Sequence, residues 1–165
     1  MVNITTTQEP PLQGWSSLLF YDGSNNLIYV CKALSTQPAY TFSVAAGTLT
    51  NVVVSAGVAT VTTTANHGLQ VGNLVTGSGS ATSALNAAVT IASVPSTTTF
   101  TFSTSAANGT YTDVLLTTTA PRSSTPVWSI QKNTYSGSNL SLVQFAYGSP
   151  VANQVADNRT SLAYA

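Results

Sequence analysis

Long runs of threonine, valine and serine, broken by glycine, asparagine and proline, dominate this sequence. Threonine and valine are branched at Cβ, which restricts their side chains in a helix and suits them to a pleated sheet. No twelve-residue window carries an apolar stripe at helical spacing with capping residues, and Ala81–Ala88 is the single short helical candidate. The sequence therefore predicts an all-β fold.

Two segments that are far apart in the sequence share a hairpin pattern. The first is Trp15–Val30, which contains the turn Asp22-Gly-Ser-Asn-Asn, and the second is Trp128–Phe145, which contains Ser136-Gly-Ser-Asn. Glycine and asparagine accept a positive φ, so each turn can reverse the chain. We expect the two hairpins to pair in one small antiparallel sandwich or barrel, with the tryptophans as core or rim anchors.

Residues 47–118 have a different composition, because they contain no lysine, arginine or tryptophan. We predict that they form a second β-barrel or sandwich, inserted into a loop of an outer domain made of residues 15–46 and 119–165. Residues 1–14 are predicted to be an extended N-terminal arm. The strands expected in the insert are Leu49–Val54, Val58–Thr64, Leu74–Gly77, Val89–Val94, Thr98–Ser103 and Thr110–Leu116, with turns at Ser55-Ala-Gly57 and Pro95-Ser96.

Charged residues make up only 5% of the chain, against about 25% in an average soluble protein. Four basic and four acidic side chains give zero net charge, which cannot supply the cationic surface that nucleic acid requires. No apolar run approaches the about 20 residues of a membrane span, and the N-terminus lacks the features of a secretory signal. The single cysteine, Cys31, allows no internal disulfide, and its apolar surroundings predict a buried, unreactive thiol.

The sequence also offers few groups for catalysis. A nucleophilic triad would have to use His67, but its Asn-His-Gly setting predicts a turn or packing role. His67 and Cys31 cannot complete a zinc site, and the Asp22 turn lacks the distal glutamate of a calcium loop. We therefore predict no enzymatic activity, no metal and no cofactor. Five tyrosines could stack on sugars, although core or interface positions are the simpler expectation: Tyr29, Tyr40, Tyr111, Tyr135 and Tyr147.

Several of these motifs resemble small virion structural proteins of tailed bacteriophages. The resemblance rests on Tyr21-Asp-Gly-Ser-Asn-Asn-Leu-Ile-Tyr-Val30, on Trp128-Ser-Ile-Gln-Lys132 with its following turn, and on the terminal Asp157-Asn-Arg-Thr-Ser-Leu-Ala-Tyr164. The run that starts at His67-Gly-Leu and the later Val94–Phe102 are similar to small β modules inserted in phage virion proteins. The second turn departs from the pattern, because Ser136 replaces the aspartate. The resemblance implies a virion component with no catalytic residues to carry over.

We predict a capsid cement or decoration protein, made in the host cytoplasm, that binds the major capsid protein on the capsid surface. Attachment through hydroxyls, strand edges and apolar side chains depends weakly on salt, which suits this composition. A homo-oligomer such as a trimer is expected, with no nucleic-acid or membrane partner. The contact residues that we predict are Ile4, Leu12, Trp15, Trp128, Asp157, Arg159 and Tyr164. The alternatives are a tail, fibre or baseplate component with a host-glycan-binding module, and an enzyme such as a cell-wall hydrolase.

Overall fold

The computed structural model describes residues 15–34 and 37–165, and within these ranges the fold is almost entirely β, as the sequence predicts. Its strands form three antiparallel sheets. The arm at residues 1–14 lies outside the described residues. The strands are β1 (Trp15–Tyr21), β2 (Leu27–Leu34), β3 (Tyr40–Phe42), β4 (Leu49–Ser55), β5 (Val58–Thr63), β6 (Leu74–Ser78), β7 (Ala88–Thr90), β8 (Ser93–Ser96), β9 (Thr99–Ser103), β10 (Gly109–Tyr111), β11 (Leu115–Thr118), β12 (Ser129–Ser136) and β13 (Asn139–Phe145).

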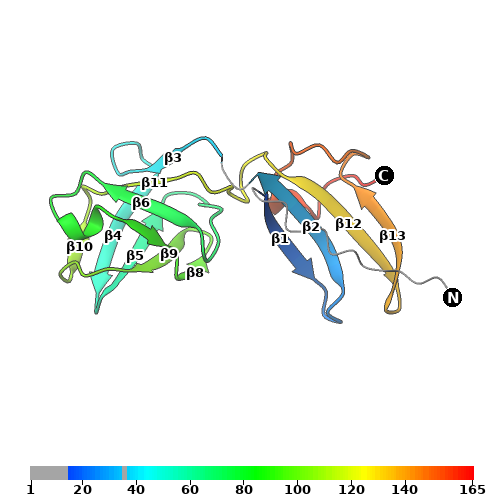
Figure 1. Cartoon of the computed structure of the whole chain (residues 1–165), viewed down its shortest axis with the longest axis horizontal. Helices are drawn as coiled ribbons and strands as arrows, with labels where there is room; N and C mark the ends of the chain where they lie inside the picture. The colour runs from blue at the N-terminus through cyan, green and yellow to red at the C-terminus, as the bar shows by residue number, and fades with distance from the viewer. Residues whose placement is uncertain (1–14, 35–36) are drawn as a thin grey trace.

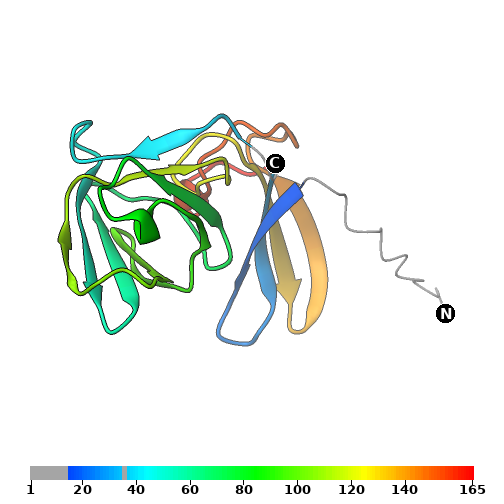
Figure 2. The same ribbon diagram turned by 60° about the vertical axis from the view of Figure 1, so that its left-hand side comes forward.

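The two related hairpins form one four-stranded sheet in the order β1-β2-β12-β13, which we call the outer sheet. The hairpins join where β2 pairs with β12, with Cys31 opposite Ile130. They therefore lie edge to edge in a single layer, as Figures 1 and 2 show, instead of facing each other. Each turn uses the expected residues, since Asn25 and Gly137 both have a φ of 62°.

The outer sheet is covered on one face by the C-terminal segment, residues 146–165. Cys31, Ala33 and Ile130 are buried on that face. They form a hydrophobic cluster with Trp128, Ala146 and Ala156, and partly buried rings and leucines from both ends of the chain pack around it. Apart from the 3-10 turn at Ala156–Asn158, the covering segment has no helix or named strand.

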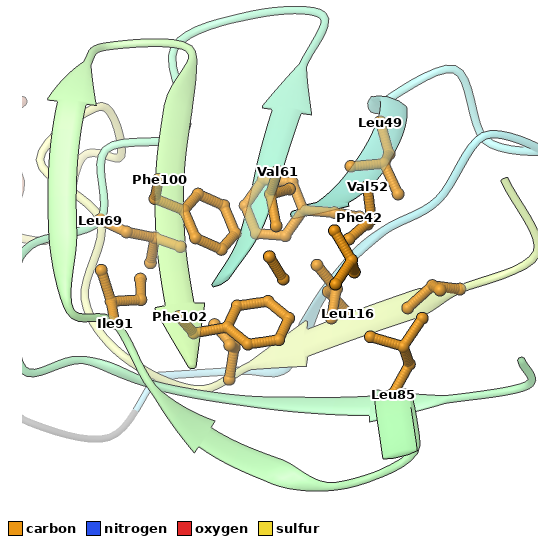
Figure 3. Packing of buried hydrophobic residues seen from close by; sticks show 14 of the residues in the cluster. Phe42, Leu49, Val52, Val61, Leu69, Leu85, Ile91, Phe100, Phe102 and Leu116 are labelled. Atoms are coloured by element: carbon orange, nitrogen blue, oxygen red, sulfur yellow. The ribbon is translucent and has the colours of Figure 1, made fainter. Parts of the chain in front are cut away.

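The middle of the chain folds into two further sheets that enclose the larger core. One has the order β10-β4-β5-β9-β8 and the other β3-β11-β6-β7. Phe42, Phe100, Phe102 and Leu116 are at most 2% exposed and meet in the centre of this core, as Figure 3 shows. We call these two sheets the insert unit. β3 precedes residue 47, where the sequence analysis begins the insert, yet it pairs with β11 in this unit.

Two of the predicted strands each divide between the two sheets of the insert unit. The predicted strand at 89–94 becomes β7 in one sheet and β8 in the other, and the chain crosses at the buried Ile91. The predicted strand at 110–116 becomes β10 in one sheet and β11 in the other, and the chain passes between the sheets at the buried Val114. Both runs are continuously β-favouring in sequence, so composition does not mark the crossing.

Local geometry also corrects two smaller predictions. The helical candidate at 81–88 contains only the 3-10 turn Ser83–Leu85. The turn expected at Pro95-Ser96 lies at the next two residues, because Pro95 is inside β8, an edge strand that tolerates a missing N–H. The turn at Ala56-Gly57 is confirmed, with φ angles of 49° and 78° that match a two-residue hairpin turn.

Candidate interaction sites

His67 is 1% exposed, and the backbone engages both of its ring nitrogens. The Leu69 N–H donates to Nδ1 at 2.9 Å, so Nε2 carries the proton and faces the carbonyls of Ser96 and Thr99 at 3.1 and 3.3 Å. Burial lowers the pKa of His67, and its ring packs edge-on to Phe100. The neutral imidazole therefore organises its own loop, which is the packing role that the sequence predicts.

The described carboxylates each anchor a loop. Asp22 accepts backbone N–H bonds from Ser24 and Asn26 within the first hairpin turn, and the bond from the Asn26 side chain contributes most to lowering its pKa. Asp113 accepts bonds from Ser80 and from the Ala81 N–H, which lowers its pKa mainly through the latter. In the described ranges, no three histidine, cysteine or acidic residues are grouped to hold a metal ion.

Cys31 is fully buried at the centre of the outer sheet. Burial raises the pKa of its thiol to about 11, so the reactive thiolate is scarce at neutral pH. The prediction of a buried thiol is confirmed.

The C-terminal motif closes the covered face of the outer sheet. The Arg159 guanidinium lies 3.5 Å from the centre of the Phe20 ring, and the Tyr164 ring is 6.0 Å from that of Tyr29. The Lys132 ammonium lies 5.4 Å from the Tyr164 ring, whose pKa rises to about 12 chiefly through burial. Pieces of all three motifs on which the phage resemblance rests therefore pack against one another.

The predicted contact residues have several different environments. Ile4 and Leu12 lie outside the described residues, and Trp15 starts β1 but its side chain is outside the description. Trp128 is 1% exposed and donates its indole N–H to the Arg122 carbonyl. Arg159 and Tyr164 are half-buried in the cluster described above. Their assignment as partner contacts stays a prediction.

Asp157 connects the C-terminal segment to the insert unit. Its carboxylate accepts a bond of 2.7 Å from the Asn66 side chain. The neighbouring Ser123 N–H donates to the Gly68 carbonyl at 2.7 Å. A Cβ at Gly68, whose φ is 65°, would lie 2.6 Å from the Ser124 hydroxyl, so glycine permits this close approach.

Four of the five candidate tyrosines are engaged within the chain. The hydroxyls of Tyr111 and Tyr135 donate to carbonyls, and the rings of Tyr29 and Tyr40 contact other side chains. Tyr147 is 63% exposed, so among these five it alone presents most of its ring to solvent.

The second face of the outer sheet carries an apolar row. Strand register places Leu19, Val30, Gln131 and Phe145 side by side across the four strands. Side chains alternate between faces, so this row points away from the buried cluster. Leu19 is 48% exposed, and Val143, two residues before Phe145, is 44% exposed. We call Leu19, Val30, Gln131, Val143 and Phe145 the open face; the sequence analysis did not single them out.

A cavity of about 260 Å³, which we call the junction cavity, lies between residues 37–40 and residues 120–127, where the chain passes between the outer sheet and the insert unit. Pro38, Ala39, Ala120 and Val127 supply apolar walls, and Gln37, Arg122 and Thr125 supply polar groups. The Arg122 guanidinium stacks 3.6 Å from the centre of the Tyr40 ring, which also lines the cavity. The sequence analysis missed this site, because Tyr40 and Arg122 are far apart in the chain and no local motif joins them.

Comparisons with known proteins give little guidance on family. No family model and no curated protein matches the chain. Among solved structures it is similar to a phage phi92 endosialidase, at 14% sequence identity and a TM-score of 0.44, over 92% of this chain and 28% of that one. At this TM-score the similarity does not establish a common fold. None of the described helices is both long and apolar enough to span a membrane.

Proposed function

We propose that this chain is a structural protein of a tailed-bacteriophage virion that works by attaching to neighbouring subunits. The observation that carries the proposal is the open face, which is apolar except for Gln131 and lies on a sheet whose other face is already covered. Such a face is stabilised when another protein removes it from water, at about 25 cal/mol for each Å² of apolar surface.

The chemistry of the titratable groups supports attachment over catalysis. Backbone groups occupy both nitrogens of His67, and each described carboxylate anchors a loop. The motifs on which the phage resemblance rests pack into one cluster in the outer unit, by which we mean the outer sheet together with residues 146–165, where they serve the fold. A virion role therefore uses the surface of this chain, and no catalytic group is assigned.

Within the virion we propose the capsid shell as the location, the major capsid protein as the partner, and self-association into a homo-oligomer. Quantitative gels of purified particles test the location. Hundreds of copies per particle are expected for a cement protein, whereas a few copies would favour the tail, fibre or baseplate alternative. Particles stripped of this protein should lose resistance to heat and osmotic shock, and unchanged resistance would contradict the cementing role.

Substitutions on the open face test the mode of attachment. The double variant Leu19→Asp and Val143→Asp places two charges on the open face and should prevent incorporation into particles. The matched control is Val71→Asp with Leu74→Asp, which adds the same charge to exposed positions of the insert unit. Equal incorporation of both double variants would show that the open face is not the attachment surface.

The enzyme alternative has its own test. His67→Ala and Asp22→Ala remove the single histidine and the turn carboxylate. We expect no hydrolytic activity on cell-wall or glycan substrates from the parent chain. An activity that these variants abolish would replace the attachment proposal.

A further inference from the structure

The junction cavity contains an arginine whose backbone is held in place from several sides. The Arg122 carbonyl accepts bonds from the Thr125 hydroxyl at 2.7 Å, the Trp128 indole N–H at 2.9 Å and the Thr125 N–H at 3.1 Å. The guanidinium is then positioned by stacking on Tyr40. A cation fixed in this way has already lost the side-chain freedom that binding would otherwise cost.

The charge of Arg122 has no carboxylate partner among the described residues. Asp22 and Asp113 are bound within their own loops, and Asp157 accepts its bond from Asn66. Within the described residues, the guanidinium lies against the rings of Tyr40 and Phe42, at 3.6 and 6.0 Å from their centres. Ring stacking covers one face of the planar group and leaves its edge, which carries five N–H donors, for an anion.

The walls of the cavity limit which anion fits. Pro38, Ala39, Ala120 and Val127 are apolar, so they suit an anion that carries a small apolar group beside its charge. A volume of about 260 Å³ is just below the about 300 Å³ at which pockets begin to hold drug-sized ligands. The space therefore suits a ligand about the size of one amino-acid residue better than an oligosaccharide.

We propose that this cavity binds the C-terminal carboxylate of a polypeptide that ends in a small apolar residue. The carboxylate accepts two N–H bonds from Arg122, and the terminal side chain packs on the apolar walls. A sugar is less suited, because Arg122 covers one face of Tyr40 and Phe42 meets that ring at an interplanar angle of 71°. The cavity is separate from the open face, so this inference does not depend on the proposed virion role.

An NMR titration of the ¹⁵N-labelled full chain tests the proposal. The probe is N-acetyl-alanyl-valine with a free carboxylate, and its C-terminal amide is the matched neutral control. A lone small site of this kind should bind in about the millimolar range. The peptide acid should shift the backbone amide signals of Ala39, Ala120 and Val127. The C-terminal amide peptide should bind at least tenfold more weakly. Equal binding of both, or no shifts with the acid, would overturn the proposal.

Variants identify the group that recognises the acid. Arg122→Gln should weaken acid binding at least tenfold, while the backbone carbonyl that holds Trp128 is retained. Arg122→Lys keeps the charge but loses the planar fork, so its affinity should be intermediate. Lys32→Gln removes an exposed cation of the outer sheet and is the control, with unchanged affinity expected. The NMR spectrum of each variant reports its fold, and undiminished binding by folded Arg122→Gln would contradict the assignment.

A separate titration with N-acetylneuraminic acid distinguishes an acidic sugar from a peptide terminus. We expect no shifts at the cavity amides from this sugar at concentrations where the peptide acid saturates. If the sugar binds through Arg122 and the peptide acid does not, the peptide assignment is wrong and an acidic glycan replaces it.

Discussion

The insert unit and the outer unit solve the problem of burying a sheet in different ways. The insert unit encloses Phe42, Phe100 and Phe102 between two sheets, so strands supply both sides of its core. The outer unit has one sheet, and a C-terminal segment with little regular structure covers one of its faces. Its stability must then depend on individual side-chain contacts from the chain's end. On its second face, Leu19 and Val143 remain about half exposed within the described residues.

Phe100→Ala should have the largest effect, and it should lower the stability of the insert unit while leaving that of the outer unit nearly unchanged. Truncation of a buried phenylalanine costs about 3–5 kcal/mol, because it removes apolar contacts and leaves a cavity. Both tryptophans, Trp15 and Trp128, belong to the outer unit, so their fluorescence reports its unfolding in urea. Circular dichroism follows strands in both units. We expect a much earlier transition by circular dichroism and a nearly unchanged midpoint by fluorescence.

The converse variant is Ile130→Ala, in the buried cluster of the outer sheet. It should move the fluorescence transition and leave the stability of the insert unit nearly unchanged. If both probes move together in both variants, the bonds between Asn66, Asp157 and Ser123 couple the units into one cooperative fold, and the contrast drawn above fails.

Arg159→Gln should destabilise the outer unit by about 1–2 kcal/mol. It removes the half-buried guanidinium, which stacks on Phe20 at 3.5 Å from the centre of the ring. Fluorescence-detected urea unfolding measures the change, and Lys32→Gln, at an exposed position of the same sheet, is the control. A shift no larger than that of the control would mean that the Arg159 side chain does not contribute to holding the C-terminal segment on the sheet.

Acid should weaken the insert unit through His67. Its pKa is lowered in the folded chain, mainly by burial, so the unfolded chain takes up the proton first. The stabilisation is then complete above the ordinary histidine pKa of 6.5 and falls as the pH drops below it, by no more than about 1.4 kcal/mol for each pH unit. Urea unfolding followed by circular dichroism between pH 7.5 and about pH 5.5 measures this slope.

His67→Gln removes the titrating group, although its side chain can still donate a hydrogen bond. The variant should be less stable than the parent chain, and its free energy of unfolding should no longer depend on pH in this range. The pKa values of Asp22 and Asp113 are lowered, so their contributions change only at lower pH. An unchanged slope in His67→Gln would assign the acid sensitivity to another group.

The sequence could predict the features that local chemistry determines. Asp22 and Gly137 identify the two related hairpin turns, and β-branched runs locate most strands of the insert unit. The crossings at Ile91 and Val114 could not be found in this way, because burial and strand propensity continue through them. The three-residue strand β3 is too short to show a pattern.

The candidate sites were harder to predict than the fold. The packing role of His67 was expected from its turn-like setting, and the Nδ1 partner, Leu69, is local, but the Nε2 partners, Ser96 and Thr99, lie 29 and 32 positions away. The stacking of Arg122 on Tyr40 joins the start of β3 to a segment that follows β11, so the two residues lie on either side of most of the insert unit in the sequence. No spacing rule connects such residues, so the junction cavity required the three-dimensional structure.

The smallest predicted effect compares the turns of the two units. The outer hairpin has Asn25 at a φ of 62°, whereas the insert hairpin has Ala56 at 49°, a left-handed conformation that asparagine adopts more readily than alanine. Ala56→Asn should therefore stabilise the insert unit by up to about 1 kcal/mol, and Asn25→Ala should destabilise the outer unit by a similar amount. The Ala56 N–H, which donates to Asn108, is retained in the variant. Circular dichroism should detect the first change and tryptophan fluorescence the second. If both probes respond to each variant, the turns share one cooperative unit despite their separate sheets.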